Sequence, residues 1–261
     1  DAPPPDAPDT AAGTDGDDTI SASGNEFLQG LLGDDVLDGS DNSTVEGGEG
    51  NDTLSARDDA TAFGGAGDDQ IVLRDSAFAS GGDGDDQVRA RETSIVRGNN
   101  GDDSLRVEDG ARARGGQGED EITVRDSAQG FGDDGNDLLD VADSGVGFGD
   151  EGDDTLIGDD SATVEGGDGN DTLVLSGASN GLGEAGNDTI TTSEFAQGFG
   201  GLGSDNLTAG GQSFISGDSG ADTLTLFGQA TGNAGSNDDV VNLSEGSFAD
   251  AGTGDDTITV Q

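Results

Sequence analysis

The stretch Gly166-Gly167-Asp168-Gly169-Asn170-Asp171-Thr172-Leu173-Val174 joins a glycine-rich acidic segment to a short apolar run. The pattern recurs every 17 residues without insertion or deletion, and its copies start at residues 13, 30, 47, 64, 81, 98, 115, 132, 149, 166, 183, 200, 217, 234 and 251. We number the positions of each copy from 1 to 17, so Gly166 is position 1 and Asp171 is position 6. A fixed short period predicts a stacked array in which each unit contacts its neighbours.

Several columns of this array are nearly invariant. Position 4 is glycine in 14 of 15 copies, position 6 is aspartate in all 15, and position 8 is always Ile, Leu or Val. Position 10 is apolar or glycine except at Thr192, and positions 14 and 16 hold small or aliphatic residues except for Glu26. This period-2 alternation predicts two strands per copy, with positions 8, 10, 14 and 16 facing a thin core.

The predicted fold is therefore all-β: a parallel β-roll or β-solenoid of about 15 coils, each made of strand, turn, strand and turn. The 50 glycines oppose helix as strongly as the alternation does. Residues 1–12 are rich in Pro, Ala and Asp, and we expect an extended leader there, followed by a continuous solenoid over residues 13–261.

The composition limits the chemistry available to the chain. Acidic side chains number 57 against nine arginines, and the net charge is -48. Such self-repulsion keeps a chain expanded unless cations neutralise it, and it excludes nucleic acid as a partner. Cys, His, Met, Trp and Tyr are absent, which removes disulfides, soft-metal sites and the usual general base. Carboxylates and the backbone remain.

Two features concern the chain's location. No apolar run approaches the roughly 20 residues that a membrane-spanning helix needs. The start, Asp1-Ala2-Pro3-Pro4-Pro5, reads as a processed N-terminus left after removal of a signal peptide. We therefore expect a secreted or extracellular protein, either free or associated with the cell surface.

The segment Gly-Gly-x-Gly-(Asp/Asn)-Asp-x-(Leu/Ile)-x resembles the hemolysin-type calcium-binding nonapeptide of RTX proteins, and the resemblance covers residues 13–261. It implies a right-handed roll whose turns bind calcium between successive coils through backbone carbonyls and the position-6 aspartate. The implied metal-binding residues are Asp18, Asp35, Asp52, Asp69, Asp86, Asp103, Asp120, Asp137, Asp154, Asp171, Asp188, Asp205, Asp222, Asp239 and Asp256.

The residues themselves favour the same ion. Stacked coils would place these aspartates about 4.8 Å apart, and like charges that close do not all stay ionised without counter-ions. Calcium takes 6 to 8 oxygen ligands with flexible geometry, whereas magnesium is stricter. The alternative, aspartates that only cap turns, would tolerate Asn or Ser, and position 6 has neither. We expect about one calcium ion in each gap between coils.

The repeat departs from the RTX pattern because its second half has eight residues instead of nine. We therefore expect one calcium row, with a second edge built differently. Position 12 on that edge is acidic in 10 of 14 copies. A solvated acidic edge is favoured there over a weaker second calcium row.

Two sets of outward side chains suggest surface contacts. Arg57, Arg74, Arg91 and Arg125 share position 11, where we expect ion pairs with the neighbouring acidic position 12. Phenylalanines occupy outward positions 15 and 17 and suggest a lateral contact surface; they are Phe27, Phe63, Phe78, Phe131, Phe148, Phe199, Phe214 and Phe248.

The phase of the repeat bears on assembly. Residues 7–261 number 255, fifteen times 17, so a second molecule placed head to tail would continue the coil. The leading hypothesis is a secreted, calcium-dependent structural protein that self-assembles into an extracellular fibre, matrix or surface layer. The alternative is a calcium-stabilised stalk or binding module of an adhesin or ice-binding protein. An enzyme is disfavoured because no copy departs from 17 residues to build a cleft.

Overall fold

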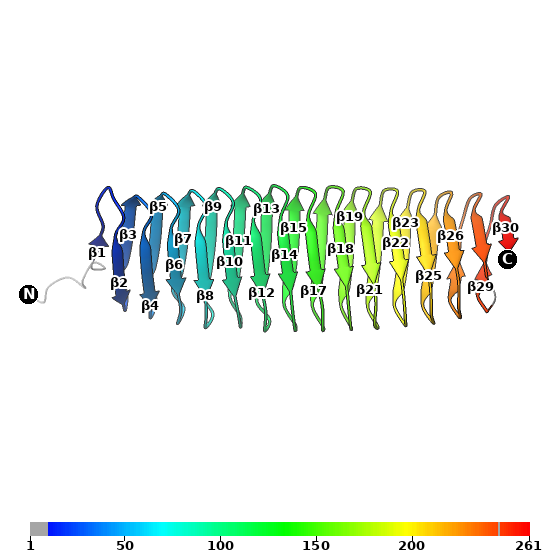
Figure 1. The fold of residues 1–261 in the computed structure, drawn as a ribbon, viewed down its shortest axis with the longest axis horizontal. Coiled ribbons are helices and arrows are strands. Elements are labelled where there is room, and N and C mark those ends of the chain that lie inside the picture. The colour runs from blue at the N-terminus through cyan, green and yellow to red at the C-terminus, as the bar shows by residue number, and fades with distance from the viewer. Residues whose placement is uncertain (1–9, 245) are drawn as a thin grey trace, which may run out of the picture. The chain divides into compact units, whose positions relative to one another are not determined.

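The computed structural model describes residues 10–244 and 246–261. The chain divides into two compact units, residues 1–122 and 123–261, and each is described by itself. Every regular element in the described residues is a β-strand (Figure 1). No helix long and apolar enough to cross a membrane is found in that part of the chain.

Each coil contributes one odd-numbered and one even-numbered strand. In the first unit these are β1 (Thr10–Ala12), β2 (Thr19–Ser23), β3 (Phe27–Leu32), β4 (Val36–Ser40), β5 (Thr44–Glu49), β6 (Thr53–Ala56), β7 (Thr61–Ala66), β8 (Gln70–Leu73), β9 (Phe78–Asp83), β10 (Gln87–Ala90), β11 (Ile95–Asn100), β12 (Ser104–Val107) and β13 (Arg112–Gln117). The boundary between the units falls within β14 (Glu121–Val124).

The second unit repeats this arrangement. Its strands are β15 (Gln129–Asp134), β16 (Leu138–Val141), β17 (Val146–Glu151), β18 (Thr155–Gly158), β19 (Thr163–Asp168), β20 (Thr172–Leu175), β21 (Asn180–Ala185), β22 (Thr189–Thr192), β23 (Gln197–Leu202), β24 (Asn206–Ala209), β25 (Phe214–Ser219), β26 (Thr223–Leu226), β27 (Thr231–Asn233), β28 (Val240–Leu243), β29 (Phe248–Asp250) and β30 (Thr257–Val260).

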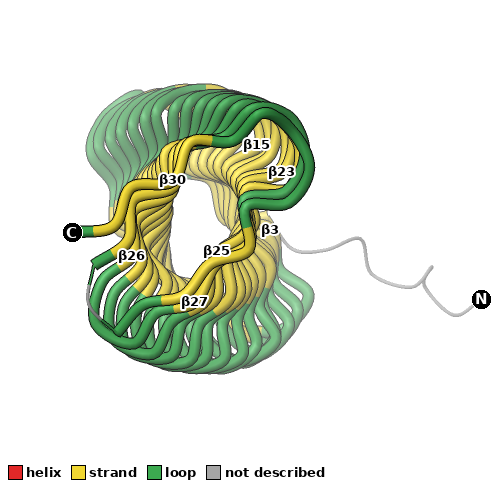
Figure 2. The backbone as a smooth tube through the Cα atoms, turned by 90° about the vertical axis from the view of Figure 1, so that its right-hand side faces the viewer, coloured by secondary structure: helices red, strands yellow, loops and turns green. Residues whose placement is uncertain are grey.

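Strands pair in parallel with a constant offset of one repeat. Leu156 lies beside Leu173, and Leu173 lies beside Ile190. Within each unit, odd strands pair only with odd strands and even strands with even strands, so every coil adds one strand to each of two sheets (Figure 2). Together the units hold about 15 turns of about 17 residues. The predicted all-β parallel solenoid is confirmed.

The predicted core positions are the buried ones. Leu173 at position 8 and Val164 at position 16 have 0 % exposure, whereas Val174, at outward position 9 beside Leu173, is 45 % exposed. Position 14 is filled by buried small residues such as Ala162 and Ala196. The alternation therefore sets which face of each strand packs inward, because successive strand side chains point to opposite faces.

The odd strands are longer than the sequence suggests. They begin at position 15 and continue through the glycines to position 3, as in β19, so the turn of the glycine-rich segment spans only positions 4 to 6. Where Ala234 and Ala251 replace glycine at position 1, β27 and β29 stop at position 17. Of the expected leader, residues 10–12 form β1, which pairs with β3, and residues 1–9 lie outside the described residues.

The backbone conformation at the second edge explains why position 12 is usually acidic. Position 12 adopts positive φ, with values of 62° at Asp143 and 56° at Asp160, and of 65° and 70° where Gly177 and Gly211 replace the acid. Glycine is unrestricted in this region, and aspartate enters it more readily than most residues do. These acidic side chains are exposed. The turn geometry thus explains why position 12 holds an acidic residue in some copies and glycine in others.

The fold makes a direct prediction about its core. Replacing Leu173 by Ala should lower the free energy of unfolding of the calcium-loaded protein by about 2–5 kcal/mol, because the change opens a cavity at a fully buried site. The matched change Val174→Ala, one residue away on the exposed face, should cost far less. Denaturant titrations of both variants measure this. Equal losses would contradict the assigned strand faces.

Candidate metal-binding edge

The position-6 aspartates lie in the turn between each odd strand and the next even strand, as Asp171 does between β19 and β20. Thirteen of them are only 1–2 % exposed: Asp35, Asp52, Asp69, Asp86, Asp103, Asp120, Asp137, Asp154, Asp171, Asp188, Asp205, Asp222 and Asp239. Asp18 and Asp256, in the outermost described coils, are partly exposed. The sequence-predicted site residues are thus brought to one edge of each unit, and thirteen of the fifteen are buried there.

Hydrogen bonds hold each carboxylate in place. The backbone N–H of Asp154 donates to Oδ1 of Asp171 at 2.8 Å, and the N–H of Asp171 donates to Oδ1 of Asp188 at 2.8 Å. The same link runs from Asp18 to Asp120 in the first unit and from Asp137 to Asp256 in the second. One oxygen of each carboxylate is therefore committed to a neighbouring coil.

The other oxygen has no such donor. Oδ2 is buried and accepts no hydrogen bond in eleven of these residues within the described chain: Asp35, Asp52, Asp69, Asp86, Asp103, Asp154, Asp171, Asp188, Asp205, Asp222 and Asp239. A buried polar atom without a partner costs about 1–3 kcal/mol, and more when it is charged. Repeated in eleven coils, this cost is large enough to require a compensating proton or cation.

The glycine columns keep this edge open to oxygen atoms. A Cβ added to Gly149 at position 1 would overlap both Oδ2 of Asp154 and the carbonyl oxygen of Gly166. A Cβ on Gly167 at position 2, where φ is 121°, would overlap a carbonyl oxygen of the preceding coil. Position 4 is crowded in the same way. At positions 1 and 4, oxygen atoms thus occupy the space that a side chain would need, whereas position 2 also accepts other residues at positive φ, such as Asp133, Asp150 and Glu184.

Burial changes the acidity of these groups. Desolvation raises the pKa of Asp69 and Asp154 to about 7 and that of Asp103 to about 8, even though a backbone N–H bond opposes the shift at each residue. Neighbouring carboxylates in the row raise these pKa values further. The row therefore does not remain fully ionised near neutral pH without a compensating positive charge.

The donor set fits a hard cation that accepts many oxygen ligands. Among the described residues, no three acidic side chains converge on one point, so a cation here must take ligands from backbone carbonyls as well as from one carboxylate per coil. Calcium takes such mixed sets with flexible geometry. The buried Oδ2 beside the carbonyl oxygen of position 1 meets that requirement.

A second ladder at position 5 was not predicted from the sequence. The backbone N–H of Asn170 donates to Oδ1 of Asp153 at 2.7 Å, and the N–H of Asn187 donates to Oδ1 of Asn170 at 3.0 Å. These bonds run toward the preceding coil, opposite in direction to the buried row. The sequence feature that could have predicted this ladder is the Asp or Asn found at position 5 in 12 of 15 copies.

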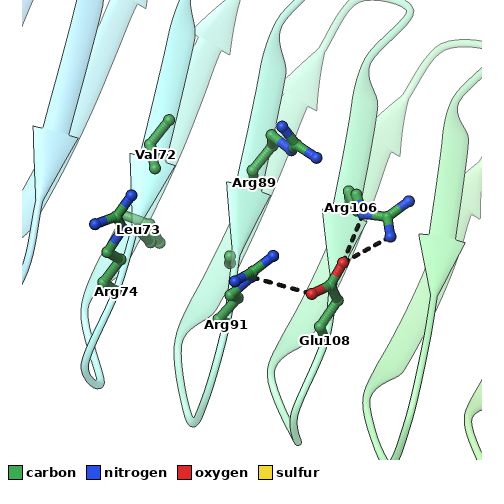
Figure 3. Close-up of a pocket in the computed structure, with 8 residues that line it drawn as sticks. Val72, Leu73, Arg74, Arg89, Arg91, Arg106 and Glu108 are labelled. Carbon is green, nitrogen blue, oxygen red and sulfur yellow. Dashed lines mark hydrogen bonds and ion pairs between the residues drawn. The ribbon is translucent and has the colours of Figure 1, made fainter.

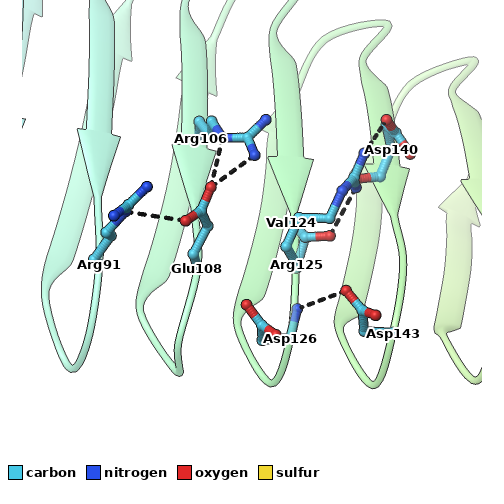
Figure 4. Close-up of polar contacts among 8 residues, drawn as sticks. All are labelled: Arg91, Arg106, Glu108, Val124, Arg125, Asp126, Asp140 and Asp143. Atoms are coloured by element: carbon cyan, nitrogen blue, oxygen red, sulfur yellow. Dashed lines mark hydrogen bonds and ion pairs between the residues drawn. The ribbon is translucent and has the colours of Figure 1, made fainter.

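The position-11 arginines that form ion pairs do so with residues other than those at position 12. Arg57 pairs with Asp38 at 3.0 Å. Arg125 pairs with Asp140 (Figure 4), so both arginines reach position 9 of a neighbouring coil. Arg91 pairs with a glutamate at position 11. The expected pairs with position 12 are wrong, because the position-12 side chains lie in the αL turn and face solvent.

The outward phenylalanines pair within the chain. Ring contacts join Phe63 with Phe78, Phe131 with Phe148 and Phe199 with Phe214, at centroid distances of 6.1, 4.8 and 5.8 Å. Phe248 is 69 % exposed. The rings thus cover part of one another's surface, and the lateral contact suggested by their column stays a prediction.

The raised pKa values predict a pH dependence with a definite sign. The ordinary aspartate pKa is 3.8, so between pH 4 and about 6–8 the folded metal-free protein holds protons that the unfolded chain has lost. Stability without metal should therefore be fully present below about pH 4 and lost as the pH rises through 6–8. Protons should also compete with calcium over that range.

Circular dichroism of protein freed of metal by chelation and gel filtration, between pH 5 and 8, measures this effect. A β signal that strengthens as the pH rises in metal-free buffer would contradict it.

Comparison with known proteins agrees with this geometry. The profile of the RTX calcium-binding nonapeptide repeat matches four stretches, residues 6–24, 21–54, 39–71 and 146–182. No curated protein matches the chain. The matched stretches contain Asp18, Asp35, Asp52, Asp69, Asp154 and Asp171, all members of the buried row or its outermost described coil. The chain thus carries RTX calcium-binding nonapeptide repeats, in a parallel β-solenoid of about 17 residues per turn.

Proposed function

We propose that the protein is a secreted, calcium-dependent structural protein that folds on binding a row of calcium ions. The observation that carries this proposal is the buried Oδ2 atom without a hydrogen-bond donor that recurs in eleven of the described coils. The position-6 aspartates and the carbonyl oxygens of the glycine-rich edge would hold the ions. Bound calcium would supply positive charge that keeps the carboxylates ionised after burial.

Charge supports coupling between calcium binding and folding. The chain has a net charge of -48 and no histidine or lysine to offset it. One calcium in each of fourteen gaps between fifteen copies would contribute +28 and leave about -20. Because the complete edge exists only in stacked coils, the free energy of binding contributes to folding. Weak sites of this kind suit millimolar extracellular calcium, which supports export before folding.

Calcium should therefore convert the chain from disordered to β-structured at pH 7.5. The double variant Asp171→Asn/Asp188→Asn should bind about two to three fewer ions, because it removes the ionised oxygens from adjacent gaps. The double variant Asp143→Asn/Asp160→Asn changes the net charge equally at exposed position 12 and should bind the full number. Circular dichroism and calorimetric calcium titration measure both properties.

Two outcomes would contradict this proposal. One is an unchanged β signal in excess chelator at pH 7.5. The other is an equal loss of bound calcium in the two double variants, which would mean that net charge, and not the buried row, determines binding.

We further propose that copies assemble end to end. Ile258 and Val260, in β30, are 54 % and 74 % exposed, whereas Leu224 and Leu226 at the same positions of β26 are at most 1 % exposed. Apolar strand faces and open strand edges of this kind favour pairing with a further coil. A second copy would supply that coil. A fibre, matrix or surface layer is the expected product.

End-to-end assembly should depend on this apolar face. In calcium, electron microscopy and sedimentation of the given chain should show filaments that lengthen with protein concentration. The variant Ile258→Glu/Val260→Glu should remain monomeric because charges would be buried at each junction, while Thr257→Glu/Thr259→Glu, on the outward positions of the same strand, should still assemble. Monomers at every concentration would overturn the assembly proposal and favour the stalk of an adhesin.

A further inference from the structure

The arginines of the chain form an unusual basic surface. All nine lie between Arg57 and Arg125, in a protein that is otherwise strongly acidic. Four of them, Arg74, Arg89, Arg91 and Arg106, surround a surface hollow of about 240 Å³ on the outer face of β8, β10 and β12 (Figure 3). We call these four residues the arginine comb.

The comb carries more positive charge than its surroundings neutralise. Glu108 is the one carboxylate that lines the hollow. It accepts from Nε of Arg106 at 2.7 Å and pairs with Nε of Arg91 at 3.0 Å. Arg74 and Arg89 form no ion pair within the described residues, although Arg89 helps to lower the pKa of Glu108 after the closer Arg106 and Arg91. Four arginines and one glutamate leave a local formal charge of +3.

The comb is periodic. Arg89 and Arg106 are register partners on adjacent strands, and Arg74 and Arg91 are likewise one repeat apart. Guanidinium groups therefore recur once per coil, at the spacing of neighbouring β-strands, roughly 4.8 Å. A ligand that uses several of these groups at once needs anionic groups at the same spacing.

The second unit contains a surface of that description. A hollow of about 410 Å³ on β15, β17, β19 and β21 is lined by six carboxylates and no basic residue; they are Asp133, Asp134, Asp150, Glu151, Asp168 and Glu184. Asp133 is the register partner of Asp150, and Asp134 that of Glu151, so these carboxylates also recur once per coil. We call this surface the acidic hollow.

We propose that the arginine comb of one copy docks side by side on the acidic hollow of a second copy. Opposite charges then meet at a common spacing, and the guanidinium fork suits bidentate contact with carboxylates. The two surfaces differ, so the contact is heterologous, and a pair of copies retains one unused comb and one unused hollow. The proposal goes beyond end-to-end stacking, because it joins the sides of calcium-loaded coils and not their ends.

The experiment uses the full chain in calcium with the substitutions Ile258→Glu/Val260→Glu, so that end-to-end stacking does not contribute. Sedimentation velocity should show association in 20 mM salt that is lost in 500 mM salt, because surface charge pairs are screened. Adding Arg74→Glu/Arg89→Glu should raise the dissociation constant at least tenfold. The control Arg97→Glu/Arg125→Glu changes the net charge equally outside the comb and should have a much smaller effect.

Complementation sharpens the test. A variant with a reversed hollow, Glu151→Arg/Asp168→Arg, should also fail to associate alone, yet it should associate when mixed with the comb variant, because an intact comb then meets an intact hollow. Glu151 and Asp168 lie at position 3 of the calcium-binding segment, so circular dichroism first establishes the calcium concentration at which every variant reaches the full β signal, and association is compared at that concentration.

Three results would overturn the proposal: equal loss of association in the comb and control variants, no recovery on mixing, or a protein that stays monomeric at low salt. In the last case, binding to a sulfated polysaccharide through the comb would identify a different partner.

Discussion

A buried row of carboxylates, one in each coil, constrains the rest of this structure. Transferring an ionised carboxylate out of water costs several kcal/mol unless an opposite charge or a proton compensates. Here each carboxylate gives one oxygen to a backbone N–H of the preceding coil and keeps the other buried. The glycines at positions 1 and 4 follow from the same arrangement, because oxygen atoms take the place of side chains. The cation requirement is thus built into the backbone.

The two edges of each coil differ in burial and in the groups that they present. The glycine-rich edge concentrates oxygen atoms and excludes water, which suits a metal row. The opposite edge turns through an αL residue at position 12, followed in several coils by a second one at position 13, as at Asp41 and Asn42, and the exposed charges at position 12 remain hydrated. The two sheet faces are left for other contacts. The arginine comb and the paired phenylalanine rings lie on these faces, whereas the acidic hollow lies at positions 2 and 3, beside the metal edge.

The sequence was sufficient to predict the coil length, the parallel pairing and the buried positions, because an invariant period forces equivalent residues such as Leu156 and Leu173 into register. It was also sufficient to align the aspartates. It did not show that the odd strands continue through Gly166 and Gly167, since glycine-rich segments ordinarily read as turns. The position-5 ladder was missed because Asp and Asn are also the residues expected in any turn, so their presence at position 5 in 12 of 15 copies did not point to bonds with a neighbouring coil.

The ion pairs were the least predictable feature. Arg125 reaches across to Asp140 and not to the adjacent acidic residue, because outward strand positions of neighbouring coils lie closer to it than the turn does. Sequence adjacency is a poor guide on a stacked sheet, where the nearest neighbour of a side chain is often 15 or 17 residues away. The comb and the hollow became visible only when residues one repeat apart were placed side by side.

The most direct test of the account is an X-ray structure of the calcium-loaded protein with anomalous diffraction data. The account predicts a row of calcium peaks along the glycine-rich edge, each within coordination distance of Oδ2 of a position-6 aspartate and of backbone carbonyl oxygens. Aspartates that remain buried without a nearby ion at saturating calcium and neutral pH, or calcium bound only at exposed position 12, would contradict it.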